Sequence, residues 1–183
     1  MKNLKKLGLA LLIIIALLTI AGFFLPRQVH VERSLTIKAA PAAIFTEINT
    51  VRSWPRWSPW HGLDPQMQVI YSGPPSGEGA GYSWTSANSN VGNGTLTVTR
   101  SQPFERIDIS MDFDENGTAT GSYLLRPAGQ GTRLTWTMDT DLGANPLERY
   151  LGLFLDKLVG ADFEKGLANL QKLVEAPAAT AQR

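Results

Sequence analysis

The sequence contains no cysteine. This absence excludes disulfide bonds, thiolate catalysis, iron–sulfur clusters and a lipid-modified cysteine in one step. It leaves the compartment open, because a chain of 183 residues can build a hydrophobic core without covalent cross-links. Histidine is nearly as scarce, since His30 and His61 are the only two. Two isolated histidines without cysteine offer no zinc site and no iron-binding triad, so we predict no metal and no cofactor.

Charge of either sign is also in short supply. Charged residues make up 18% of the chain, and the formal net charge is +1. A protein that binds nucleic acid needs a basic face to displace counterions, so we predict no nucleic-acid partner. Hydrophobic residues make up 43%, which is ordinary for a folded globular protein and too high for a disordered one.

The chain does have one long apolar run near its N-terminus. Residues 8–25, GLALLIIIALLTIAGFFL, contain no charged residue, and a bilayer core requires roughly 17–25 such residues. A cleaved signal peptide is the alternative, but its apolar region usually has about 7–15 residues and ends in a small-residue cleavage site. Here the run ends with Phe23, Phe24 and Leu25, followed by Pro26. We therefore predict an uncleaved transmembrane anchor.

The flanking charges predict how this anchor is oriented. Lys2, Lys5 and Lys6 precede the run, whereas Arg27 alone follows it closely. By the positive-inside rule the N-terminus is cytoplasmic, so we expect a single-pass protein of the cell membrane with its folded domain outside the cytoplasm. The predicted organisation is 1–26 for the cytoplasmic lysines and the anchor, 27–176 for one domain, and 177–183 for a disordered tail.

The domain begins with a strand and a short helix. Residues 28–38, QVHVERSLTIK, alternate, and four of the five residues on one face are apolar, with Arg33 as the exception. This pattern predicts a strand with one buried side. Pro41 suits the first position of a helix, and Phe45 and Ile48 follow it at helical spacing. A proline-broken segment comes next.

From residue 67 to residue 141 the pattern is mostly period two, with turn residues between the runs. The run RIDISMDF at 106–113 places four apolar side chains on one face, and Asn116-Gly117 after it is a hairpin turn signal. We expect about six antiparallel strands. They lie at 67–72, 82–86, 95–101, 106–113, 118–127 and 131–139.

The period changes from two to that of an α-helix in the last segment. Asn145 suits a helix cap and Pro146 a first helical position, which predicts a helix from about 146 to 175 with Gly160 as its weak point. Its apolar face is expected to carry two runs of residues spaced by three and four. These are Leu147, Leu151, Phe154 and Leu158, then Phe163, Leu167, Leu170 and Val174.

This order of elements predicts an α+β fold. An antiparallel sheet with one apolar face must cover that face, and the long C-terminal helix is the one element able to do so. A sheet curled around a single helix leaves space between the two, because strands and helix diverge at one end. We expect an apolar cavity there.

Two segments resemble the START-like, or SRPBCC, superfamily, and within it the polyketide cyclase/dehydrase branch. They are ERSLTIKAAPAAIFTEINTVRSWPRWSPW at 32–60 and LVGADFEKGLANLQKLVE at 158–175. The resemblance covers about 28–175 and implies a helix-grip fold, with a curved antiparallel sheet around the C-terminal helix and a deep apolar cavity between them. Members bind lipids, sterols, polyketides or hormones, and some catalyse cyclisation or dehydration. An N-terminal membrane anchor departs from the usual soluble members.

Three of the five tryptophans fall in the proline-broken segment SWPRWSPWHG at 53–62. Three roles are open for Trp54, Trp57 and Trp60. They can pack the junction between the short helices and the sheet, line or close a cavity mouth, or lie among lipid headgroups. The first two roles overlap, because a cavity wall is also core.

Binding of an apolar small molecule or lipid, held at the membrane by residues 8–25, is the function that we predict. Such a cavity is mostly apolar, with a few polar groups that orient the ligand. Burying about 300 Å² of apolar ligand surface contributes about 7 kcal/mol before the costs of association, so no catalysis is needed. The residues predicted to line the site, each also a candidate for ordinary core, are Phe45, Trp54, Trp57, Tyr71, Tyr82, Trp84, Met111, Trp136, Phe154 and Leu158.

An enzyme and a structural module are the alternatives. His61 lies three residues before Asp64 and is the one candidate for a general base. A cyclase or dehydratase acting on a hydrophobic substrate would use His61, Asp64 or a pocket tyrosine. A cavity packed shut would instead indicate a structural or interaction module.

Overall fold

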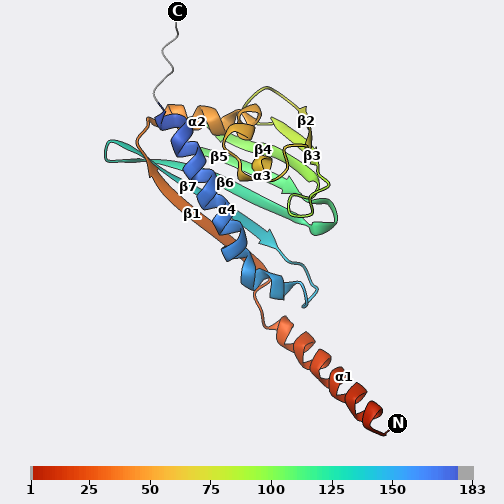
Figure 1. Ribbon diagram of the computed structural model, residues 1–183. Helices are drawn as coiled ribbons and strands as arrows, with labels where there is room; N and C mark the ends of the chain where they lie inside the picture. The colour runs from red at the N-terminus through yellow and green to blue at the C-terminus, as the bar shows by residue number, and fades with distance from the viewer. Residues whose placement is uncertain (1, 177–183) are drawn as a thin grey trace, which may run out of the picture.

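The computed structural model describes residues 2–176, and the tail predicted at 177–183 lies outside them. Seven antiparallel strands form a sheet, and α4 (Arg149–Glu175) lies across its inner face (Figure 1). The strands are β1 (Gln28–Ile37), β2 (Gln68–Ser72), β3 (Gly81–Thr85), β4 (Gly94–Gln102), β5 (Arg106–Asp112), β6 (Thr118–Ala128) and β7 (Gly131–Asp141). The other helices are α1 (Lys2–Phe23), α2 (Pro41–Asn49) and α3 (Pro59–Leu63), with 3₁₀ helices η1 (Val51–Arg56) and η2 (Asp114–Asn116).

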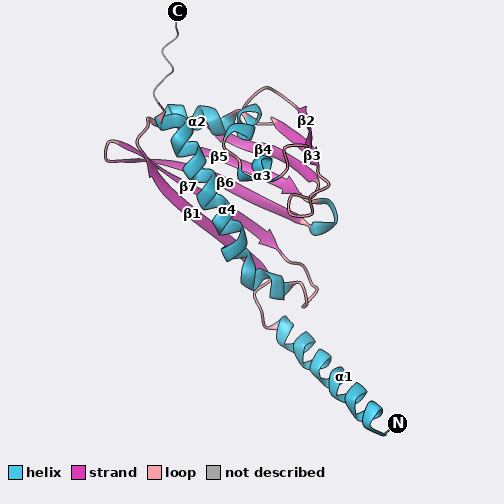
Figure 2. Ribbon diagram, in the orientation of Figure 1, coloured by secondary structure: helices cyan, strands magenta, loops and turns pink. Residues whose placement is uncertain are grey.

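The strand order across the sheet is β1-β7-β6-β5-β4-β3-β2. The strands from β2 to β7 follow one another as an antiparallel meander, whereas α2, η1 and α3 carry the chain from β1 to the opposite edge. The sheet curves around α4 (Figure 2). The predicted α+β fold, its strands and its first short helix are confirmed, and the strand bounds lie within two residues of the expected ones.

The inner face of the sheet carries the apolar half of each alternating strand, and it forms the core. The register places Val31 of β1 opposite Met138 of β7, and Val98 of β4 opposite Ile109 of β5. All four side chains are buried. Helix α2 and the second half of α4 cover this face, and each large apolar side chain buried between the layers contributes about 1.5–3 kcal/mol. The buried helical residues are Ile44, Phe45, Ile48, Phe163, Leu167 and Leu170.

The first half of α4 departs from the prediction. The helix begins at Arg149 because the Asn145 side-chain oxygen accepts a hydrogen bond from the Leu147 backbone N–H at 3.0 Å and holds the preceding residues in a turn. The first predicted apolar run is exposed, so its assignment to the buried face is wrong. The step from Leu158 to Phe163 is five residues, which rotates the second run by about 140° around the helix relative to the first. Only the second run can therefore face the sheet.

The side chain of Arg33 packs closely against α4 at Gly160. Arg33 lies on the apolar face of β1, but its guanidinium reaches across to α4 and pairs with Asp156 at 2.9 Å and Glu164 at 2.8 Å. A Cβ at position 160 would overlap this guanidinium, so a larger residue there would require the Arg33 side chain to shift. Gly160 is thus a point of close approach between helix and sheet, and its role as the weak point of the helix stays a prediction.

Helix α1 extends away from the domain (Figure 1). Among the described residues, Lys5–Phe23 is the one helical stretch long and apolar enough to cross a membrane, with a mean hydropathy of 2.4 and 6% of it buried. The membrane anchor itself stays a prediction. Among the described residues, every buried hydrophobic core residue lies between Val31 and Leu170, so the segment from residue 27 contains this whole core and we expect it to fold without α1.

Candidate functional site

A cavity of about 260 Å³ lies between the inner face of the sheet and helices α3 and α4. It occupies the gap that opens where sheet and helix diverge. Inward-facing side chains of β3 to β7 supply about half of its wall, and η1, α3, α4 and the loops next to β2, β4 and β5 supply the rest. The lining residues are Trp54, Trp60, His61, Met67, Tyr82, Trp84, Asn90, Val91, Leu96, Ile109, Met111, Phe113, Tyr123, Trp136, Met138, Val159 and Phe163.

The floor of this cavity is a cluster of aromatic rings. Trp136 stacks on Phe163 with ring centroids 4.0 Å apart and an angle of 7° between the planes. Tyr123 lies 5.0 Å from Trp136, and Trp57 meets it edge-on at 5.8 Å. Aromatic pairs at these separations are each worth about 0.5–1.5 kcal/mol beyond the area they bury. The floor is therefore a rigid wall made from β6, β7, α4 and the tryptophan segment.

The tryptophan segment serves both packing and the cavity. Trp54 and Trp57 are 2% and 1% exposed, and the Trp54 indole N–H donates to the Ile48 carbonyl oxygen at 2.8 Å, which fixes η1 against α2. Trp54 lines the cavity, whereas Trp57 lies behind the wall. Trp60 is partly exposed and lines the cavity beside Trp136 at 5.7 Å. The segment is core on one side and cavity wall on the other.

The partly exposed lining residues mark the mouth of the cavity, and several of them lie at the end of the sheet from which α1 departs. These partly exposed residues include Val91 before β4, Phe113 after β5 and Val159 of α4. The strand register places the end of β5, the start of β6 and the end of β7 at the same edge of the sheet. The end of β7 in turn pairs with Gln28 at the start of β1. Because α1 leads directly into β1, the mouth and α1 lie at the same end of the domain.

Polar groups without partners lie in this apolar wall. The Tyr123 hydroxyl and both ring nitrogens of His61 are buried and have no hydrogen-bond partner in the part of the chain that the structure describes. Leaving such a group unpaired costs about 1–3 kcal/mol. Burial raises the pKa values of Tyr123 and Tyr82 and lowers the pKa of His61, so all three side chains are neutral near pH 7. The wall of the cavity thus contains neutral polar groups that have no partner among the described residues.

Five of the ten predicted site residues line the cavity: Trp54, Tyr82, Trp84, Met111 and Trp136. The other five lie elsewhere. Phe45 packs on Phe104 in the core at 5.5 Å, Trp57 lies behind the floor, and Tyr71 lies beside Tyr82 at 6.0 Å. Phe154 and Leu158 are exposed on α4, so placing them in the cavity was wrong.

Tyr123, Phe163 and Val159 line the cavity but were not among the site residues predicted from the sequence. Tyr123 faces inward because it alternates with Gly121 and Leu125 along β6, all three buried. That period-two pattern was readable in the sequence. The five-residue step from Leu158 to Phe163 turns the second half of α4 toward the sheet, which brings Phe163 and Val159 to the cavity. This step is also visible in the sequence.

Asp64 is not a partner of His61. Its carboxylate accepts hydrogen bonds from the Ser86 hydroxyl at 2.6 Å and from the Gln66 backbone N–H at 2.9 Å. These bonds tie the loop before β2 to the loop after β3. Asp64 does not line the cavity, and its role is to position the loops beside the mouth.

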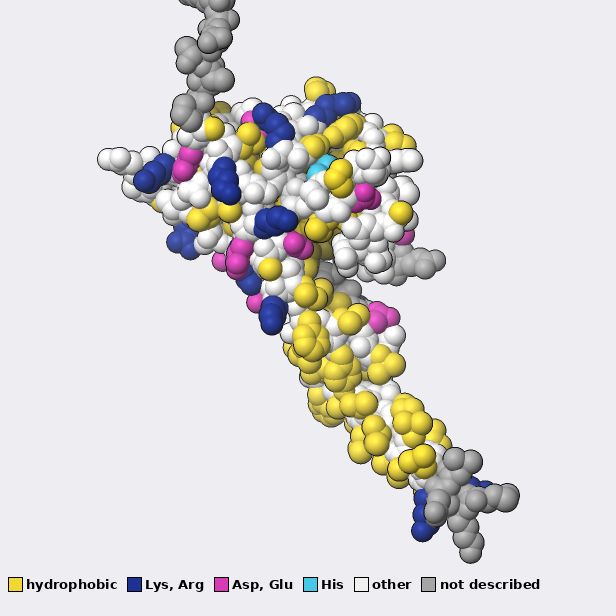
Figure 3. Space-filling model, in the orientation of Figure 1, with side chains coloured by type: hydrophobic (Ala, Val, Ile, Leu, Met, Phe, Trp, Pro, Cys, Tyr) yellow, Lys and Arg dark blue, Asp and Glu magenta, His cyan; other side chains and the backbone are white. Residues whose placement is uncertain are grey.

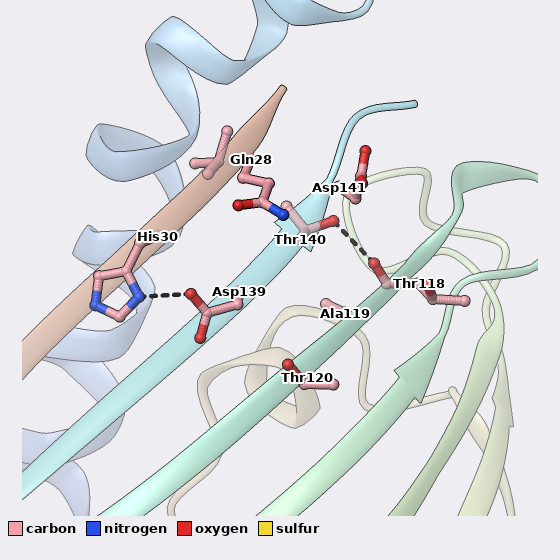
Figure 4. Close-up of a pocket in the computed structure, with 9 residues that line it drawn as sticks. Gln28, His30, Thr118, Ala119, Thr120, Asp139, Thr140 and Asp141 are labelled. Carbon is pink, nitrogen blue, oxygen red and sulfur yellow. Dashed lines mark hydrogen bonds and ion pairs between the residues drawn. The ribbon is translucent and has the colours of Figure 1, made fainter. Parts of the chain in front are cut away.

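A second hollow, of about 500 Å³, is an open groove at the same end of the sheet (Figure 4). It is lined mainly by exposed polar side chains of β1, β6 and β7, and Figure 4 shows His30 turned toward Asp139 across the strands. The His30 Nδ1 and the Asp139 carboxylate are 2.7 Å apart. With most of its lining solvated, this groove lacks the mostly apolar wall of the cavity.

The two histidines provide a check on this geometry. Hydrogen bonding to Asp139 raises the pKa of His30, whereas burial lowers the pKa of His61. In the domain 27–183, nuclear magnetic resonance titration should show one histidine titrating above about 6.5 and the other below it. Asp139→Asn should lower the pKa of His30 alone. Two histidines that both titrate near 6.5 would contradict the described burial of His61.

The same shifts set opposite dependences of stability on pH. The folded pKa of His61 lies below its unfolded value, so the unfolded chain binds more protons at this site. Its contribution is intact above about 6.5 and declines as the pH falls from there through the folded pKa. The contribution of His30 is present below about 6.5 and is lost as the pH rises through its raised folded pKa.

A family model described as polyketide cyclase/dehydrase and lipid transport matches residues 28–175, which is the whole sheet, the short helices and α4. The chain belongs to this family. No curated protein matches the sequence. The family match covers the cavity completely and leaves α1 outside it.

Solved structures of this fold are similar to the domain. StfQ, a di-domain ARO/CYC from the steffimycin biosynthetic pathway, matches with a TM-score of 0.63 and 13% identity over 81% of this chain and 51% of that chain. A protein from Rhodobacter sphaeroides matches with a TM-score of 0.61 and 20% identity, over 82% of this chain and 94% of that chain. Ara h 8.0201 matches with a TM-score of 0.58 and 14% identity, over 82% of this chain and 99% of that chain. At these identities the likeness shows the fold alone.

Proposed function

We propose that the protein binds an apolar small molecule in the cavity between the sheet and α4, while α1 anchors the domain to a membrane. The observation that carries this proposal is the partly open, mostly apolar cavity with unpaired polar groups in its wall. A packed-shut interior would have favoured a structural module, and the interior is not packed shut.

The size of the cavity limits the ligand. A volume of about 260 Å³ lies just below the usual range of about 300–1,000 Å³ for small-molecule pockets. The ligand is therefore a small apolar molecule, or one end of a longer one, and not a whole phospholipid. Burying about 200 Å² of its apolar surface contributes about 5 kcal/mol before association costs, which corresponds at best to a Kd of about 0.2 mM from this burial alone.

The polar groups limit the ligand further. A hydroxyl, carbonyl or amine on the guest can pair with the Tyr123 hydroxyl or with a ring nitrogen of His61. Both side chains are neutral, so nothing in this pair attracts a charged guest. The ligand class is thus an apolar molecule with one or two neutral hydrogen-bonding groups.

The anchor places the cavity where apolar molecules are concentrated. Helix α1 contains a stretch of 19 residues, Lys5 to Phe23, that is long and apolar enough to cross a membrane. The cavity mouth lies at the end of the domain to which α1 is joined. A tether keeps the site at high effective concentration near the bilayer without adding any contact. With Lys2, Lys5 and Lys6 before the apolar run at 8–25, we propose a cytoplasmic N-terminus and a domain outside the cytoplasm.

A cyclase or dehydratase is the second candidate. His61 and Tyr123 line the same cavity, one as a proton acceptor and the other as a proton donor, and StfQ of similar fold comes from a biosynthetic pathway. Such an enzyme would convert a hydrophobic substrate in the wild type and lose that turnover in His61→Gln. A carrier would release the same compound unchanged.

The test uses the domain 27–183, purified without detergent. We expect organic extraction and mass spectrometry to find a copurified apolar compound, or the emptied domain to bind 1-aminoanthracene with a submillimolar Kd. Tyr123→Phe should weaken the probe's binding, since the variant keeps the ring and removes the hydroxyl. A domain that carries no compound and binds no probe up to the probe's solubility would overturn the proposal.

A further inference from the structure

The first half of α4 presents an apolar stripe to solvent. Leu147, in the turn just before α4, and Leu151, Phe154 and Leu158 on α4 are 56%, 64%, 58% and 63% exposed, and a spacing of three and four places the last three on one side of the helix. We call these four residues the α4 stripe. At 1.5 Å per residue its helical part is about 10 Å long. Soluble monomers rarely leave large side chains gathered in this way without a partner.

The start of the stripe lies against α1. The Tyr150 hydroxyl donates to the Leu18 carbonyl oxygen at 2.7 Å, and an Arg149 guanidinium N–H donates to the Phe23 carbonyl oxygen at 3.0 Å. Gly22 packs so closely on Pro146 that a Cβ there would overlap the Pro146 backbone. The first turn of α4 and the last turns of α1 are thus one packed unit.

These contacts set the depth of the stripe relative to the proposed span. Leu18 precedes the end of the span at Phe23 by five residues, which is about 7–8 Å along the helix axis. The Tyr150 hydroxyl reaches that level, so its ring lies below the outer edge of the span. Leu147 and Leu151, on either side of Tyr150, then lie at the boundary of acyl chains and headgroups. Phe154 and Leu158 follow outward through a headgroup layer that is about 5–7 Å thick on each side.

The apolar surface is continuous at this junction. Figure 3 shows hydrophobic side chains running from α1 onto the adjoining end of the domain. Full burial of a large apolar side chain removes roughly 60–120 Å² from water, so the four residues can bury roughly 250–500 Å². A stable contact with a second copy requires about 800 Å² per partner, so the stripe alone is too small for one. A lipid surface has no such threshold, because the anchor already holds the domain against it.

We propose that the α4 stripe enters the bilayer interface and seats the domain with its cavity mouth close to the lipid. This inference rests on the anchor proposed above and names the bilayer as the source or destination of the ligand. Val159, which borders the mouth, directly follows Leu158 in α4. The stripe therefore leads from the acyl boundary to the rim of the cavity.

Spin labels on the full chain in nanodiscs of 3:1 phosphatidylcholine and phosphatidylglycerol test this proposal. The chain has no cysteine, so each variant carries one label. We expect the label in Leu151→Cys to lie about 5–10 Å inside the headgroup boundary by oxygen and nickel accessibility, with Phe154→Cys shallower and Leu158→Cys shallowest. Matched controls are Lys165→Cys, exposed further along α4, and Ser110→Cys, exposed on the outer face of β5, and both labels should be accessible to nickel.

The anchor is tested separately in the same nanodiscs by Ile14→Cys. A label at position 14 in hydrocarbon, with labels at 154 and 158 as nickel-accessible as the one at 110, would overturn the docking and leave the anchor standing. A water-accessible label at position 14 would overturn both. Dipolar broadening between labels at 154 would show that a second copy covers the stripe, which also overturns the proposal. Binding of 1-aminoanthracene by the domain 27–183 is independent of all three results.

Discussion

Trp136→Ala is expected to lower the free energy of unfolding by about 3–5 kcal/mol, out of a total of about 5–15 kcal/mol for a domain. Trp136 is 2% exposed and is the central ring of the cavity floor, where it stacks on Phe163 and meets Trp57, Trp60 and Tyr123. Its removal leaves a void that the paired sheet strands cannot collapse to fill. At about 2–4 °C per kcal/mol, the melting temperature should fall by about 6–20 °C.

Trp60→Ala is the matched control for this loss. Trp60 borders the same cavity and contacts Trp136 and Phe163, but it lies in the short helix α3 and is partly exposed. We expect a cost below about 2 kcal/mol, since surface-accessible sites collapse more readily than buried ones. Urea denaturation of the domain 27–183 measures both. Equal costs for the two variants would mean that the aromatic floor is not the centre of the core.

Met111→Trp is expected to weaken binding of 1-aminoanthracene by at least about tenfold, or about 1.4 kcal/mol. Met111 lies on the inner face of β5 and lines the cavity close to its mouth. An indole there occupies space that the guest needs, while a partly exposed methionine position tolerates the larger side chain. The melting temperature should change little, because the indole fills a void and displaces no packed neighbour.

Ser110→Trp adds the same indole to the adjacent, outward-facing position of β5. It should leave the Kd for 1-aminoanthracene within about twofold of the wild type. If Met111→Trp fails to fold, Val159→Trp fills the cavity from the α4 wall instead. An unchanged Kd in a folded filling variant would place the probe outside the cavity and sink the binding site described here.

The strands and α2 could be predicted because each depends on a local pattern. Alternation marked β1 and β5, and Pro41 marked the start of α2, since burial of one face and the missing proline N–H act within a few residues. The exposed side of α4 was predictable in principle from the five-residue step between Leu158 and Phe163. Treating the two runs as one face obscured that step.

Other features depend on contacts between distant residues, and no local pattern carries them. Arg33 reads as a polar exception in β1 until α4 brings Asp156 and Glu164 to it, more than 120 residues away in sequence. Asp64 reads as a partner for His61 until the fold supplies Ser86. The volume of the cavity likewise depends on sheet curvature and on how closely side chains interlock, so sequence predicted a gap and not its size.

The methyl groups of methionine provide the most direct measurement of a guest in the cavity. The domain 27–183 contains three natural methionines, Met67, Met111 and Met138, and all three line the cavity. With ¹³C-methyl methionine, adding 1-aminoanthracene should shift all three methyl signals through the ring current of the guest and give nuclear Overhauser contacts from its ring protons to Met111 and Met138. Signals of Met111 and Met138 that stay in place while the probe binds would show that the space between sheet and α4 holds no guest.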